Sequence, residues 1–115
     1  MPELSELKMI ELVEKFKEDV INIQESRSAK LFKQASADLQ KIYNYHLSND
    51  KMFKRVQMNL KNLYTSFNYS AVIVNDAVKK RAFDKDNEEL LDECLEVMLR
   101  CCTVIIATLK NKKRK

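Results

Sequence analysis

Apolar residues recur along this chain at every third or fourth position, the spacing that places them on one face of an α-helix. The first such stretch predicts a helix over residues 3–24. A second helix follows, which Ser26 or Ser28 can cap, and its apolar stripe continues to His46. The joint over residues 25–28 contains no Gly or Pro, so one long bent helix is the alternative there.

Three turn-forming and capping residues in a row, Ser48-Asn49-Asp50, predict the next break. The apolar spacing then resumes and predicts a third helix over residues 50–82. Asn68-Tyr69-Ser70 could kink or break this helix, but the apolar stripe runs through it and favours continuity.

A second polar turn, residues 84–87, separates the third helix from a fourth over residues 87–110. Asp86 is the expected cap of the fourth helix, because Glu89 follows it at capping-box spacing. The fourth helix is apolar almost all round, which is typical of a helix surrounded by protein. It is therefore either central in its own bundle or covered by another chain.

Composition narrows the fold further. The 115 residues contain no Gly, and Pro2 is the only Pro, which argues against a β-rich fold and excludes glycine-defined phosphate and dinucleotide loops. We expect one all-α domain over residues 1–109, an antiparallel bundle with four helices of which the third and fourth are long. A basic tail follows over residues 110–115.

Charge is organised by segment. Residues 1–25 and 84–109 are acidic, residues 26–47 and 48–83 are basic, and the net charge of +4 depends on the tail. An antiparallel bundle would place helices of unlike charge side by side at both short connections. Exposed ion pairs are weak individually, so this pattern guides topology more than stability.

Cysteine usage and the ends of the chain suggest a compartment. Cys94, Cys101 and Cys102 are odd in number and poorly spaced for a local disulfide, and no secretory pattern opens the chain. We expect reduced thiols in an intracellular, reducing environment, with the nucleus as one location that the basic tail allows. The uncharged run over residues 101–109 is too short to span a bilayer, so no membrane association is expected.

Catalytic and metal-binding groups are sparse. His46 is the only histidine, and a lone histidine at a helix C-terminus most often acts as a capping cation. Adjacent Cys101 and Cys102 on one helix point in different directions and cannot easily share a zinc ion, so core thiols are the preferred interpretation. We expect no enzyme activity, no cofactor and no metal.

The favoured function is a non-enzymatic protein–protein interaction or assembly module, a subunit or adaptor of an intracellular complex. Its mechanism would be burial of apolar helix surface against a protein partner or against a second copy in a homodimer. The candidate partner-binding residues lie off the main stripes of the third and fourth helices: Tyr69, Val72, Ile73, Val97, Val104 and Ile106.

The alternative function is association with nucleic acid. Basic residues on one side of the third helix and in the tail could track phosphates. They are Lys51, Lys54, Arg55, Lys61, Lys112, Lys113 and Arg114. The tail could instead be a nuclear import signal or a solubilising end.

Overall fold

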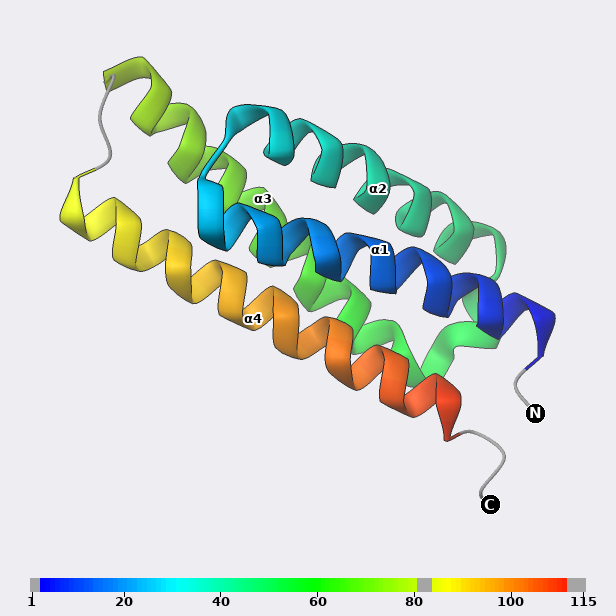
Figure 1. Cartoon of the computed structure of the whole chain (residues 1–115). Coiled ribbons are helices and arrows are strands. Elements are labelled where there is room, and N and C mark those ends of the chain that lie inside the picture. The colour runs from blue at the N-terminus through cyan, green and yellow to red at the C-terminus, as the bar shows by residue number, and fades with distance from the viewer. Residues whose placement is uncertain (1–2, 81–83, 112–115) are drawn as a thin grey trace.

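The computed structural model describes residues 3–80 and 84–111. Within them the chain forms four α-helices and one short 3-10 helix, η1, and no strand. The elements are α1 (Leu4–Ser26), α2 (Ala29–Ser48), η1 (Asp50–Val56), α3 (Gln57–Lys80) and α4 (Lys85–Lys110). The predicted all-α antiparallel bundle is confirmed (Figure 1).

The helices form an elongated bundle of 49 × 22 × 20 Å. Figure 1 shows α2, α1 and α4 side by side, with α3 passing behind them. α1 packs on both α2 and α4, and α3 packs closely on α4, so α1 and α3 lie diagonally across the bundle. Between α2 and α3 the backbones approach each other only briefly.

The joint between α1 and α2 is a true break. Arg27 adopts a left-handed conformation with φ 57° and ψ 24°, and its N–H donates to the Ile23 carbonyl at 2.9 Å. Ser28 then caps α2, because its side chain accepts a hydrogen bond from the Lys30 N–H at 3.2 Å. Two separate helices are therefore confirmed, with Ser28 rather than Ser26 as the cap.

The predicted start of the third helix is wrong. Residues 50–56 form the tighter η1, with a non-helical Phe53 (φ −110°, ψ 24°), and α3 begins only at Gln57. This turn brings Phe53 and Val56 into the core, where both are fully buried. Beyond it, α3 is continuous through residues 68–70, as predicted. The predicted end of this helix, near residue 82, lies outside the described residues.

The predicted cap of the fourth helix is also wrong. Asp84, not Asp86, is the N-cap, and its Oδ1 accepts a hydrogen bond from the Asn87 N–H at 2.8 Å. The helix begins at Lys85, and Asp86 lies in its first turn, where an acidic side chain complements the helix dipole.

α4 is the central helix of the bundle. It contacts α1, α3 and η1, and its main face is fully or nearly fully buried. Val97, Leu99 and Ile106, on the flanks of that face, are half-buried against the same core. The apolar excess predicted for this helix is thus largely absorbed within the bundle. Leu90 and Val104 remain 40% and 44% exposed.

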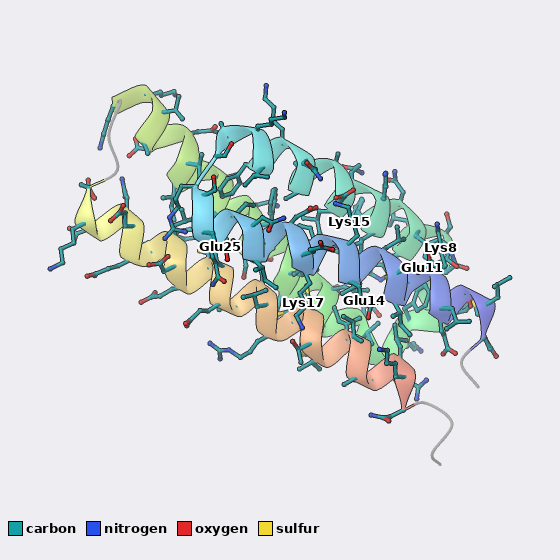
Figure 2. All side chains as sticks on the ribbon, in the orientation of Figure 1. Lys8, Glu11, Glu14, Lys15, Lys17 and Glu25 are labelled. Atoms are coloured by element: carbon teal, nitrogen blue, oxygen red, sulfur yellow. The ribbon has the colours of Figure 1, made fainter. Side chains whose placement is uncertain are left out.

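Charge pairs connect neighbouring helices. The two acidic helices, α1 and α4, lie side by side, and cations at their seam offset the like charges. Lys110 Nζ lies 3.6 Å from Glu14 Oε2, and Arg27 pairs with Asp92. Figure 2 shows charged side chains spread along α1. These exposed pairs are each worth about 0–1 kcal/mol.

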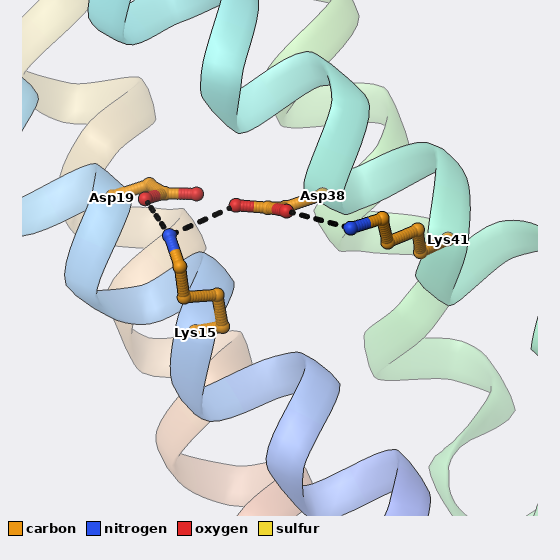
Figure 3. Close-up of polar contacts among 4 residues, drawn as sticks. All are labelled: Lys15, Asp19, Asp38 and Lys41. Atoms are coloured by element: carbon orange, nitrogen blue, oxygen red, sulfur yellow. Dashed lines mark hydrogen bonds and ion pairs between the residues drawn. The ribbon is translucent and has the colours of Figure 1, made fainter.

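A polar cluster lies between α1 and α2 (Figure 3). Lys15 Nζ donates to Asp19 Oδ1 at 2.9 Å and to Asp38 Oδ2 at 3.2 Å, and Lys41 approaches Asp38 at 3.8 Å. The second oxygen of Asp19 is buried and faces the Asp38 carboxyl group. Burial, reinforced by the hydrogen bond to Asp38, raises the pKa of Asp19 to about 6. The same hydrogen bond lowers the pKa of Asp38, so the pair is best satisfied with one proton, on Asp19.

We expect Asp19→Asn to become more stable relative to the wild type as the pH rises. Because the folded-state pKa of Asp19 lies above its ordinary value of 3.8, the proton's contribution to stability is present at low pH and is lost as the pH rises through about 6. An Asn side chain has nearly the same shape as the Asp19 side chain and cannot ionise. Urea unfolding measures the free energy of unfolding of both proteins at pH 4.5 and pH 7.5. The value for the variant minus that for the wild type should rise by on the order of 1 kcal/mol between the two pH values. Parallel pH profiles for the two proteins would contradict this assignment.

Candidate functional site

Exposed apolar side chains gather where the outer flanks of α3 and α4 meet. On α3, Tyr69 is 55% exposed and Val72 is 67% exposed, and Leu90 of α4 lies beside them. Ile73 is buried beneath this group. We call the surface the α3–α4 face and define its apolar part by Tyr69, Val72, Ile73, Leu90, Cys94 and Val97.

The α3–α4 face is hollowed. Two adjoining depressions of about 330 and 520 Å³ share Tyr69 and Leu90, so they form one shallow groove along the two helices. Its edges are polar and partly acidic, with Asp76 from α3 and Glu93 from α4. An apolar floor with a polar edge is the usual anatomy of a protein interface.

The structure places the six sequence-predicted partner residues unevenly. Tyr69, Val72, Ile73 and Val97 come together on the α3–α4 face. Val104 lies seven residues beyond Val97, which continues the same flank of α4 by two turns. Ile106 is on the other flank, in a groove between α1 and α4 that combines apolar side chains with charged ones such as Glu14 and Lys110.

Two members of the α3–α4 face were missed at the level of sequence. Leu90 and Cys94 belong to the groove but were assigned to no surface. A signal for Leu90 does exist, because Leu90, Val97 and Val104 are spaced by seven residues. Cys94 is one turn of helix from both Leu90 and Val97.

The three thiols are free, and they differ in access. Cys101 and Cys102 are buried, whereas Cys94 is half-buried in the wall of the α3–α4 groove. Burial raises the pKa of all three, to about 12 for Cys102, and Glu93 raises that of Cys94 further. None therefore has the stabilised thiolate that a reactive cysteine needs.

His46 does not cap α2, contrary to the prediction. It is buried, with Nδ1 3.1 Å from the Tyr64 hydroxyl. Nε2 lies 3.3 Å from Asp50 Oδ1 but is not aligned for a hydrogen bond. Burial and the nearby Tyr43 raise the pKa of Tyr64, so its phenol holds its proton firmly. The cluster pins the α2–η1 corner to α3 and presents no activated nucleophile; that the chain is not an enzyme stays a prediction.

The described part of the chain contains neither a metal-binding cluster nor a membrane-spanning helix. Among residues 3–80 and 84–111, no group of three His, Cys, Asp or Glu side chains is arranged to hold a metal ion. Over those residues, no helix combines the length and the apolar character that crossing a membrane requires.

The predicted basic residues fall in two elements rather than on one helix. Lys51, Lys54 and Arg55 belong to η1, and only Lys61 lies on α3. Arg55 is engaged with the buried Glu6 carboxylate, 3.8 Å away. Lys112, Lys113 and Arg114 lie outside the described residues.

Comparison of the chain with protein-family models, with curated proteins and with solved structures gave no match to any of them. The interpretation of function therefore depends on the geometry of this molecule.

We expect a thiol reagent such as DTNB at pH 8 to react with one thiol of the native protein. Cys94 is the accessible thiol, while Cys101 and Cys102 are sealed in the core and should react only on unfolding. Absorbance at 412 nm would show about one reacted thiol per chain in buffer and three reacted thiols per chain in urea. Cys94→Ser should remove the native reaction, and rapid reaction of all three thiols without urea would contradict the packing of α4.

Proposed function

We propose that this protein is a non-enzymatic protein–protein interaction module, a subunit or adaptor that docks a protein partner on the α3–α4 face. The observation that carries the proposal is the gathering of Tyr69, Val72 and Leu90, all substantially exposed, around one groove on two rigid helices. Exposed apolar groups scattered singly need no explanation, but a contiguous set around a groove is typical of an interface.

The composition of the face suits recognition. Tyr69 offers a large ring with a polar tip, the kind of side chain that dominates binding energy at interfaces. Glu93 at the edge would favour a partner with basic groups around its apolar contact and would help to set its orientation, whereas Asp76 is already paired with Lys80 at 3.2 Å. The face is built on α3 and α4, which pack tightly on each other, so little ordering would be required on binding.

We expect Val72→Asp to abolish partner capture while leaving the fold intact. Val72 is mostly exposed, so a charge there costs little stability but would be desolvated in the interface. The matched control is Leu47→Asp, because Leu47 of α2 is 60% exposed and lies outside the α3–α4 face. Proteins that co-purify with the tagged chain should fall at least tenfold with Val72→Asp and stay unchanged with Leu47→Asp, as read by quantitative mass spectrometry.

The same purified proteins also show whether the chain associates with itself. Light scattering would show a second copy as the partner if the wild type is a dimer and Val72→Asp a monomer. If Val72→Asp changed neither the captured proteins nor the mass in solution, the proposed role of the α3–α4 face would be wrong.

One structural observation supports a second candidate function, association with nucleic acid. α3 and α4 are antiparallel, so η1 with Lys51 and Lys54 packs beside the end of α4 at Lys110. Figure 1 shows both at the same end of the bundle. Basic residues that are far apart in sequence therefore share one end of the molecule, where phosphates could meet them together.

We expect a chain lacking residues 112–115 and carrying Lys51→Glu and Lys54→Glu to lose affinity for a 20-base-pair duplex at least tenfold. Wild-type affinity should fall by about two orders of magnitude between 50 and 200 mM salt if about four to five phosphates are neutralised. Fluorescence anisotropy of a labelled duplex measures both. Binding that is absent, or insensitive to salt, would end this candidate.

A further inference from the structure

A second groove runs between α2 and α3, on the opposite flank of α3 from the α3–α4 face. The two helices meet mainly through rings: Phe32 and Phe67 have centroids 6.1 Å apart, and Tyr43 and Tyr64 have centroids 5.2 Å apart. Beside these contacts lie two hollows of about 300 and 310 Å³, which share Ser36 and Phe67 and so form one groove. We call it the α2–α3 groove.

The α2–α3 groove has an apolar floor toward Val78 and a mixed polar and apolar lining toward Tyr43, and its edges are uncharged or basic. Phe32, Phe67 and Val74 form the floor at one end, where Val78 stands 60% exposed at the mouth. The edges carry hydroxyl and amide side chains together with Lys33. No Asp or Glu of the described residues lines either hollow.

The groove has the length of a short helix. On α2 it runs from Ala29 to Tyr43, fourteen residues apart, which corresponds to about 21 Å of helix. A partner helix of about four turns would span it and could place apolar side chains along the floor at spacings of three and four. A helix satisfies its own backbone, so it can enter an apolar groove without unpaired N–H and C=O groups.

Charge around the groove identifies the kind of helix. Lys33 lines the groove itself, and Lys61 and Lys79 lie on α3 between the groove and Val72, since Lys79 follows Asn75 by four residues and Val72 by seven. The carboxylates of the two helices lie elsewhere. Asp38, the only acid of α2, contacts Lys15 of α1, and Asp76, the only acid of α3, lines the α3–α4 face.

We propose that the α2–α3 groove binds an acidic amphipathic helix of a protein partner. The apolar stripe of that helix would cover Phe32, Phe67 and Val78. Its carboxylates would lie beside Lys33 and on the side of the groove toward Lys61 and Lys79. The proposal goes beyond the function assigned to the α3–α4 face and does not depend on it. Two docking surfaces on the two flanks of α3 would let one molecule bridge two partners.

The test uses two fluorescein-labelled 16-residue helical peptides with the same leucine stripe, one flanked by Glu and the other by Lys. Fluorescence anisotropy with the whole chain should show binding of the Glu peptide and at least tenfold weaker binding of the Lys peptide. Val78→Glu and Lys33→Glu should each lower the affinity of the chain for the Glu peptide at least tenfold. Both positions are exposed, so circular dichroism should confirm an intact fold.

The matched control is Val72→Glu, which places the same charge on the α3–α4 face and should leave peptide affinity unchanged. The proposal is overturned if neither peptide binds, if the two bind equally, or if Val72→Glu weakens binding as much as Val78→Glu does. It is also overturned if the chain alone forms dimers that Val78→Glu dissociates, because the occupant would then be a second copy. None of these results depends on the partner of the α3–α4 face.

Discussion

The packing of α4 between α1 and α3 is the constraint on which the rest of the structure depends. Leu91, Leu95, Met98 and Cys102 of α4 are fully buried, and its half-buried flanks lie against the same core. With α4 occupying the centre, α1 and α3 are diagonal, and α2 is held mainly by α1. Both open surfaces follow from this arrangement. Among residues 3–80 and 84–111, no further helix covers the outer flank of the α3–α4 pair, and the α2–α3 seam closes mainly through side chains.

Charge gives these two surfaces opposite character. The α3–α4 face has Glu93 and the Lys80-paired Asp76 at its edge, whereas Lys33 and no carboxylate of the described residues line the α2–α3 groove. α3 belongs to both, with Val72 on one flank and Val78 on the other. The buried carboxyl groups of Asp19 and Asp38 lie at a third place, the α1–α2 seam, where both accept hydrogen bonds from the ammonium group of Lys15. Under the two proposals made above, α3 would contact one partner on each flank.

The apolar periodicity predicted the helices and their breaks well, because each helix buries a stripe against the bundle. It could not place the start of α3, since Phe53, Val56 and Leu60 are spaced for either an α-helix or a 3-10 turn. Nor could it choose between Asp84 and Asp86, because both are good caps and a single hydrogen bond to Asn87 decides. For the candidate surface, the pattern of one helix shows which residues leave its main face but not which neighbour covers each flank. Val97 therefore lies on the α3–α4 face and Ile106 lies toward α1.

Amide hydrogen exchange, resolved by residue, tests the central position of α4 most directly. Amides buried on all sides open only with global unfolding, whereas a helix held along one seam opens locally at lower cost. The account predicts the slowest exchange in α4, around Leu95, Met98 and Cys102, and faster exchange along α2. If α2 amides were as protected as those of α4, or if α4 exchanged first, the core would be organised differently and neither open surface would follow from it.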